Sequence, residues 1–475
     1  MSILFYLFNY TTLVLLVLPL YYLYFRASCR SKNPAVLPTN WPILHMFPSF
    51  VANLHNMNDY FTLVLTRSGH NFRAHGPPGT GMRFFITCDP ANIRHIFTTN
   101  YTNFPKGAEF AAIFDIMSGG IFTIDGEPAH RQRAKIKSVI SNPRLMFDLA
   151  AMPLFGVDPD LLSLDMPPNE AAVAMDTVME VAYFRVVVLT SCWKLMRRLN
   201  IGPERKLKAA HKVLRGFVVE MMERRKINTS SVGNDEQHEG VDIMSSFLND
   251  PYYTEDDMFN ALTISYMLAA RDTVGTALTW IFYNLAQNPN IVSIIRNELS
   301  PIASRKVAAH PDAMVIFEPD ETKSLVYLRA VLYETLRLYP PAPLERKMVA
   351  ANDIMPSGHE VHAGDTIFIS LHSMGRMEGI WGKDCLDYNP DRWLSEDGNK
   401  LRYVPSHKFL AFNSGPRMCL GKDIAVMQMK TVIASTLWNF DLEVMEGQCI
   451  EPKSSCIQEM KNGLIVKLKK REMLH

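Results

Sequence analysis

The chain has 475 residues and a mass of 54.0 kDa, so it can bury a large core without disulfides or structural metals. Its 49 Lys and Arg residues balance 48 Asp and Glu residues, which excludes a chain that coats nucleic acid, and we expect no nucleic-acid partner. The seven cysteines are scattered without a C-x-x-C pair. This excludes a disulfide framework and a zinc ribbon, and favours a reducing compartment.

The N-terminal segment is long and apolar enough to span a membrane. Residues 3–25 contain no charge, and a helix of this length matches a hydrocarbon core of about 30 Å. Arg26, Arg30 and Lys32 follow directly, so the positive-inside rule places the remainder in the cytosol. A cleaved signal peptide is the alternative, although no basic region precedes the apolar stretch. We therefore predict that residues 1–33 form a single-pass anchor.

Four prolines follow the predicted anchor and favour extended backbone, so residues 34–48 are predicted to form a neck. The body, residues 49–475, shows no internal repeat and no second domain boundary. We expect one domain that is mostly α-helical with small β-sheets.

Helical periodicity dominates this body, because apolar residues recur at three- and four-residue spacing over long segments. These predicted helices cover residues 206–225, 256–288 and 325–338. Runs rich in β-branched and aromatic residues are shorter and predict strands. They cover residues 82–88, 366–371 and 463–468. The polar stretch 227–240 is predicted to be a surface loop.

A glycine-rich loop precedes Cys419, and an apolar helical pattern follows it. At a helix N-terminus the dipole and free N–H groups lower the pKa of a thiol, which suits a metal-ligating thiolate. Gly415 and Gly421 would let backbone or a flat cofactor come close, and Arg417 could pair with a carboxylate. The alternative is that Cys419 is an inert small hydrophobic residue.

The segment from Phe412 to Gly421 matches the pattern F-x-x-G-x-R-x-C-x-G at all five fixed positions. The chain thus resembles the cytochrome P450 family of haem-thiolate monooxygenases. The resemblance implies the P450 fold and haem b, with Cys419 as the axial ligand of the iron. Arg417 would pair with a haem propionate, and Phe412 would pack beside the thiolate. A thiolate ligand pushes electron density onto iron and favours O–O cleavage.

Glu334 and Arg337 lie three residues apart in a predicted helix, which places both charges on one face. Alone, such a pair is usually a solvated surface pair. It resembles the E-x-x-R motif of the family, and Arg392 lies in a segment that resembles the element whose arginine joins it, with Asp391 where Glu is usual. The resemblance implies a buried network of these three charges with a structural role.

Asp272 and Thr273 lie midway along the predicted helix 256–288, in a segment that resembles the family's sequence above the haem. Thr273 is expected to hydrogen-bond to the carbonyl four residues earlier and to open the helix locally. The resemblance implies that both residues deliver protons during catalysis. An ordinary exposed Asp-Thr pair is the alternative.

Arg133 aligns with the arginine of the family's W-x-x-x-R element, which holds a haem propionate. Ala129 stands at the tryptophan position, and whether His130 replaces that donor is left open by the sequence. Relative to the family pattern, a helical segment is missing near residues 134–146. Losing a packed helix exposes apolar surface on its neighbours.

Three segments resemble the plant branch of fatty-acid and alkane hydroxylases, and the chain is most similar to the mid-chain alkane hydroxylase-like family. These segments are residues 100–110, 270–273 and 409–417. The candidate substrate-lining stretches, by analogy, are residues 110–122, 262–269 and 342–346. Their apolar side chains suit an aliphatic or aromatic ligand, and equally suit plain core packing.

The resemblance implies a monooxygenase of the endoplasmic reticulum membrane with a cytosolic catalytic domain. It would hydroxylate a long-chain aliphatic substrate, a fatty acid or an alkane, with O2. The chain has no G-x-G-x-x-G fingerprint, so electrons would come from NADPH through NADPH-cytochrome P450 reductase. The branch also contains phenol-coupling oxidases of alkaloid synthesis, so two alternatives stay open: oxidative phenol coupling, and a haem-binding but inactive truncated isoform.

Overall fold

The computed structural model describes residues 37–41, 43–117, 119–140, 169–231, 247, 264–309 and 313–471. The predicted anchor, residues 1–33, lies outside these ranges, as does part of the predicted gap region 134–146. Within the described ranges, no helix combines the length and apolar character needed to cross a membrane.

The end of the predicted neck is helical rather than extended. Pro48 lies in the first turn of α2 (Phe47–Ala52), where a missing N–H costs no helical hydrogen bond. Trp41 and His45 form a β-bridge just before this helix. The prediction was therefore wrong for the last residues of the neck.

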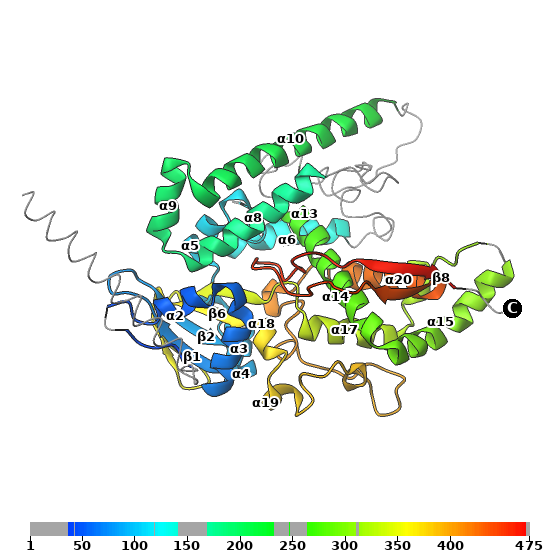
Figure 1. Cartoon of the computed structure of the whole chain (residues 1–475). Coiled ribbons are helices and arrows are strands. Elements are labelled where there is room, and N and C mark those ends of the chain that lie inside the picture. The colour runs from blue at the N-terminus through cyan, green and yellow to red at the C-terminus, as the bar shows by residue number, and fades with distance from the viewer. Residues whose placement is uncertain are drawn as a thin grey trace, which may run out of the picture.

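Helices make up most of the described body, as the sequence predicts (Figure 1). Two predicted helices are confirmed as α10 (Gly202–Ser231) and α17 (Val326–Leu338). α10 continues into the predicted loop 227–240, so the prediction was wrong for residues 227–231. Each residue added to an existing helix forms a backbone hydrogen bond, and this propagation overrides the weak helical preference of a polar segment.

The predicted helix at residues 256–288 is interrupted in the structure. Its described part consists of α13 (Ser265–Met267), the π-helical turn η7 (Leu268–Asp272) and α14 (Thr273–Gln287), and residues 256–263 lie outside the described ranges. A π-turn widens a helix locally, and such turns are frequent at functional sites.

α14 lies within a large helical core. Its buried face packs with α17, α15 (Pro289–Ala309) and α20 (Lys422–Asn439), as Figure 1 shows. α20 confirms the helix predicted after Cys419. The sequence analysis missed α15, which begins at Pro289 and contains Pro301, because proline weakens the helical signal.

A mixed four-stranded sheet lies at the other end of the molecule in Figure 1, beside α3 (Met57–Arg67). Its order is β1-β2-β6-β3, with β2 and β6 parallel and the other pairs antiparallel. The strands are β1 (Asn71–His75), β2 (Arg83–Thr87), β6 (Thr366–Ser370) and β3 (Leu344–Met348). β2 and β6 confirm two predicted strands. Every residue of β6 is buried, as expected of an interior strand.

The third predicted strand, residues 463–468, starts later in the structure. It is β8 (Val466–Lys470), which pairs antiparallel with β7 (Phe440–Val444). Gly463 has φ +68°, a conformation outside the β region, so the strand begins beyond it.

Further helices complete the body, and α8 packs along α10 on one side of the molecule (Figure 1). They are α4 (Pro90–Arg94), α5 (Gly107–Ile113), α6 (Gly126–Ile140), α8 (Glu170–Val187), α9 (Thr190–Leu199), α16 (Pro319–Thr322), α18 (Leu371–Met374) and α19 (Glu378–Trp381). The remaining turns and strands are η1 (Leu54–Asn56), η2 (His95–Thr99), η3 (Tyr101–Asn103), η4 (Asp115–Met117), η8 (Pro390–Trp393), η9 (Gly415–Arg417), β4 (Asp353–Ile354) and β5 (Glu360–Val361).

Candidate active site

Cys419 lies in the loop between η9 and α20. Its backbone N–H donates a 2.7 Å hydrogen bond to the carbonyl oxygen of Phe412, which closes the loop. The residue is accessible, yet the surrounding protein desolvates the sulfur. This desolvation raises the pKa of the Cys419 thiol, although the Gly421 N–H and the charge of Arg133 act in the opposite direction. The sequence analysis predicted a lowered pKa for Cys419, and for the protein without haem that prediction was wrong.

Gly415 and Gly421 allow two different kinds of close approach. A Cβ on Gly415 would lie 2.0 Å from the Phe97 carbonyl oxygen, so the backbone of η2 passes directly against this glycine. A Cβ on Gly421 would meet no protein atom within 4 Å. The space beside Gly421 therefore suits a group that is not part of the protein, as the sequence predicts for a flat cofactor.

Arg417 and Arg133 both approach this loop. Arg417 is buried and donates to the Ile124 carbonyl oxygen at 2.7 Å, and it also pairs with Asp125. Arg133, on α6, donates to the Met418 carbonyl oxygen. Burial is the main cause that lowers the pKa of Arg133, and the nearby positive charge of Arg417 lowers it further.

The position of the missing tryptophan faces the interior. Ala129 is buried, whereas the neighbouring His130 is exposed on the surface of α6. The buried position of the indole is therefore filled by the methyl group of Ala129.

The structure adds two lysines that the sequence analysis missed. Lys347, on β3, is 1% exposed, and its Nζ has no hydrogen-bond partner. Burial and then the charge of Lys106 lower the pKa of Lys347 to about 7. Lys106 itself pairs with Glu345. The sequence held one signal for this site. Lys347 lies in a strand of a buried sheet, and a buried charge needs a partner.

These lysines belong to the same electrostatic neighbourhood as Arg417. Coulombic interactions connect four cationic side chains with two carboxylates there. The members are Lys106, Lys347, Arg417, Arg133, Glu345 and Asp125. A cluster with more cations than carboxylates, in which the Lys347 ammonium makes no hydrogen bond, suits an anionic ligand.

Thr273 makes the predicted hydrogen bond, since its Oγ1 donates to the Ala269 carbonyl oxygen at 2.6 Å. This bond spans η7, where the helix is widened. Asp272 is 5% exposed, and its Oδ1 accepts from Arg271 Nη1 at 2.6 Å, whereas its buried Oδ2 has no partner. Burial raises the pKa of Asp272 to about 7, although Arg271 opposes this shift. The alternative that Asp272 belongs to an ordinary exposed Asp-Thr pair is therefore wrong.

Glu334, Arg337 and Arg392 meet as the sequence predicts. Arg337 donates to both Glu334 oxygens at 2.7 and 2.8 Å, and Arg392 Nε donates to Glu334 Oε1 at 2.9 Å. The side chains of Glu334 and Arg337 are 0% exposed. The Cys385 carbonyl oxygen accepts a further bond from Arg337 at 2.6 Å, so the charges are satisfied without water.

Apolar side chains from the candidate substrate-lining stretches come together beside η7. Phe114, Ile116, Met117 and Leu268 belong to one buried cluster, which also includes the inner faces of α8 and α10. Leu344 packs instead against the cluster beneath the sheet. Residues 262 and 263 lie outside the described ranges. The structure thus brings together the stretches 110–122 and 262–269 but not the stretch 342–346.

A cysteine loop that leads into a core helix, a widened helix with an acid and a threonine, and a buried Glu-Arg-Arg network occur together in an oxygenase of the haem-thiolate class. A family model described as "Cytochrome P450" matches residues 43–471. The chain belongs to the cytochrome P450 family. It is therefore a monooxygenase that uses O2, electrons from a redox partner, and haem whose iron takes a cysteine thiolate.

Plant P450 enzymes are similar to the chain over almost its whole length. Noroxomaritidine synthase 1 of Narcissus pseudonarcissus is 35% identical over 94% of both chains. Alkane hydroxylase MAH1 of Arabidopsis thaliana is 33% identical over 97% of this chain and 99% of its own length. Cytochrome P450 86B1 of Arabidopsis thaliana is 34% identical over 94% and 88% of the respective chains. The predicted resemblance to plant alkane and fatty-acid hydroxylases is confirmed.

The first of these alignments spans 490 positions, more than the 475 residues of this chain, so some of its gaps fall in this chain. This agrees with a missing segment, whose place near residues 134–146 stays a prediction.

The residues around Cys419 fit haem. The accessible sulfur provides a thiolate once a metal ion displaces its proton. Haem carries two propionates, and a cluster with more cations than carboxylates suits two further carboxylates. Gly421 has no side chain, and its open position leaves its backbone accessible to a flat cofactor.

Proposed function

We propose that the chain is a membrane-anchored monooxygenase that hydroxylates a long-chain aliphatic substrate, a fatty acid or an alkane. The observation that carries this proposal is the apolar cluster of Phe114, Ile116, Met117 and Leu268 directly before the acid-threonine pair. Apolar side chains of this kind stabilise an aliphatic chain by burying it and offer it no charged partner. Similarity to alkane hydroxylase MAH1 over both full chains supports the same substrate class.

Cys419 is the proposed axial ligand, and bound haem supplies the oxidising chemistry. Arg133 and Arg417 would hold the propionates, together with Lys347, whose ammonium makes no hydrogen bond to protein and lies 3.8 Å from its counter-charge Glu345. Phe412 accepts the Cys419 N–H with its carbonyl oxygen and so orients the loop. Glu334, Arg337 and Arg392 support the core behind this loop rather than take part in chemistry.

Asp272 and Thr273 are the proposed proton-delivery residues. A carboxyl whose pKa is about 7 can both accept and release a proton at neutral pH, which suits a general acid-base group. Its Oδ2 has no partner that competes for the proton. Thr273 Oγ1 donates its own proton to the Ala269 carbonyl oxygen, so its lone pairs stay free to accept one.

The apolar N-terminal residues support a single-pass anchor in the endoplasmic reticulum membrane, with residues 49–475 in the cytosol. NADPH-cytochrome P450 reductase is the proposed electron donor, because the chain has no dinucleotide fingerprint of its own.

Oxidative phenol coupling is a second candidate, because noroxomaritidine synthases match the chain as closely as the hydroxylases do. The two reactions differ in the product mass. After incubation with reductase, NADPH and ¹⁸O₂, hydroxylation of hexadecanoic acid or a long-chain alkane adds one labelled oxygen. A coupled phenol without labelled oxygen would instead support the second candidate.

The carbon monoxide difference spectrum of the reduced, membrane-expressed protein tests ligation and folding together. We expect the thiolate-type Soret band in the natural chain and in Cys192→Ala, which removes an exposed thiol on α9. Cys419→Ala should lose that band. A band retained in Cys419→Ala would contradict the ligand assignment. A band at the inactive position in the natural chain would support the haem-binding but inactive truncated isoform, and no band would show that the chain does not hold haem.

A further inference from the structure

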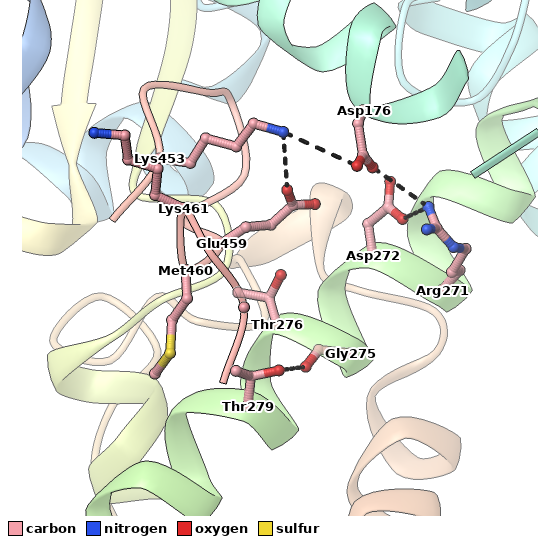
Figure 2. Close-up of a pocket in the computed structure, with 11 residues that line it drawn as sticks. Asp176, Arg271, Asp272, Gly275, Thr276, Thr279, Lys453, Glu459, Met460 and Lys461 are labelled. Carbon is pink, nitrogen blue, oxygen red and sulfur yellow. Dashed lines mark hydrogen bonds and ion pairs between the residues drawn. The ribbon is translucent and has the colours of Figure 1, made fainter. Parts of the chain in front are cut away.

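Asp272 lines a cavity of about 350 Å³ whose walls come from three distant parts of the chain (Figure 2). η7 and α14 form one wall, and α8 contributes Asp176. The third wall is the segment Lys453, Glu459 and Lys461 before β8. Among the described residues, this cavity connects the proposed proton donor with groups that are in contact with solvent.

A chain of charged side chains follows the cavity wall. Arg271 Nη1 lies 2.6 Å from Asp272 Oδ1 and 3.7 Å from Asp176 Oδ1. Lys453 Nζ lies 3.9 Å from Asp176 Oδ2 and 3.8 Å from Glu459 Oε2. Figure 2 shows Glu459 and Asp176 directed toward the same ammonium group. Three carboxylates are thus held around one space.

The exposure of these carboxylates increases in steps from the helix to the surface. The side chain of Asp272 is 2% exposed, that of Glu459 22%, and that of Asp176 36%. Glu459 is intermediate in exposure, and it lines the same cavity as Asp272. Burial, and then the negative charge of Asp176, raise the pKa of Glu459, so protonation of its carboxylate costs less near neutral pH.

We propose that Glu459 is a proton-relay residue that takes protons from solvent and returns them to Asp272 through this cavity. Hydronium protonates the Glu459 carboxylate, and the proton passes through water in the cavity to Asp272 Oδ2, the oxygen without a partner. Glu459 then returns to the carboxylate form, and no electron changes place. Glu459 acts through Asp272 and does not touch the substrate, so this inference rests on the proposed role of Asp272.

Several charges set the proton affinity of Glu459. Asp176 and Glu180 face it from α8, and Arg271 faces it from η7. Lys453 lies on its own segment and also pairs with Glu180 at 2.8 Å. Neutralising Glu459 removes one negative charge that raises the pKa of Asp272, so the pKa of Asp272 should fall.

The first test uses infrared spectroscopy of the full-length holoenzyme in membranes, without substrate. We expect a protonated carboxyl band that titrates near neutral pH and that Asp272→Asn removes. Glu459→Gln should shift this titration to lower pH, whereas Glu451→Gln, a surface carboxylate of the same segment paired with Lys461, should not. An unshifted band in Glu459→Gln would overturn the coupling between the two residues.

The second test measures NADPH oxidation against pH with reductase and hexadecanoic acid. We expect Glu459→Gln to lower the rate at least fivefold above pH 7, with a smaller loss at acidic pH, and Glu459→Asp to restore most of it. An equal loss at every pH without rescue by Asp, or no loss, would overturn the relay. If Asp272→Asn also leaves rate and peroxide yield unchanged, the proposed role of Asp272 itself fails.

Discussion

Trp393 donates its indole N–H to Glu334 Oε2 at 2.9 Å, although 58 residues of chain separate them. Glu334 Oε1 also accepts the backbone N–H of Asn389 at 2.8 Å. Together with Arg337 and Arg392, these donors saturate a carboxylate that is completely buried. The network thus connects α17 to η8 and the segment before it, and the carboxylate is costly to remove because each donor would lose its partner.

We predict that Glu334→Gln lowers the free energy of unfolding by about 3–5 kcal/mol, since it leaves the Arg337 charge buried without a counter-charge. Glu220→Gln is the matched control. It breaks an exposed pair with Arg224 on α10 and should cost less than about 1 kcal/mol. Urea unfolding followed by circular dichroism measures both, and similar losses in the two variants would contradict the buried network's structural role.

Gly415→Ala should yield little folded, haem-containing protein. The residue has φ +58°, and an added Cβ would lie 2.0 Å from the Phe97 carbonyl oxygen, so either backbone segment must move, at a cost of about 3 kcal/mol or more. Gly216→Ala, on α10 with no atom within 4 Å, should be stabilising by up to about 1 kcal/mol. The melting temperature and the haem content per protein test both variants. A Gly415→Ala protein with an unchanged melting temperature and haem content would show that the backbone of Phe97 does not confine the loop at Gly415.

Thr273→Ala should retain haem but divert electrons to peroxide. The substitution removes the hydroxyl that donates to Ala269 beside the widened turn, and loss of one positioned proton-transfer group typically costs about a hundredfold or more in the step it serves. Thr279→Ala removes the same type of bond, from Thr279 to the Gly275 carbonyl oxygen, further along α14. The ratio of hydrogen peroxide to NADPH consumed with hexadecanoic acid is the measurement. Equal ratios in the two variants would refute the role of Thr273.

Lys430→Met should stabilise the protein most at neutral pH. Lys430 is 1% exposed, and burial lowers its pKa to about 7, with Arg329 adding to the shift. Between about pH 7 and the unfolded value of about 10.5, the unfolded chain binds the extra proton, so the natural protein gains stability as pH rises. The difference in melting temperature between variant and natural protein should therefore shrink toward pH 10. Lys208→Met is the control. Lys208 lies on the exposed face of α10, so this variant measures how the same exchange changes the melting temperature at the surface.

Local patterns carried a large part of this structure. Apolar spacing predicted α10, α17 and α20, and the fixed residues around Cys419 predicted the haem class. The Glu334 network was predicted through resemblance, and the Thr273 hydrogen bond follows from a contact four residues away along one helix. The helices and the Thr273 bond depend on neighbours in sequence, which is why one sequence suffices to predict them, whereas Arg392 joined the Glu334 network only through the family resemblance.

Contacts between distant segments were decided only by the tertiary structure. Lys347 meets the charges of Lys106 and Arg417 only in the folded chain, because these residues lie far apart in the sequence. The raised pKa of Cys419 depends on desolvation by the whole surrounding fold, which outweighs the local N–H groups. Glu459 meets the neighbourhood of Asp272 only because the segment before β8 folds against η7 and α8. The sequence by itself therefore determined the chemistry of the site, whereas packing decided which charges surround it.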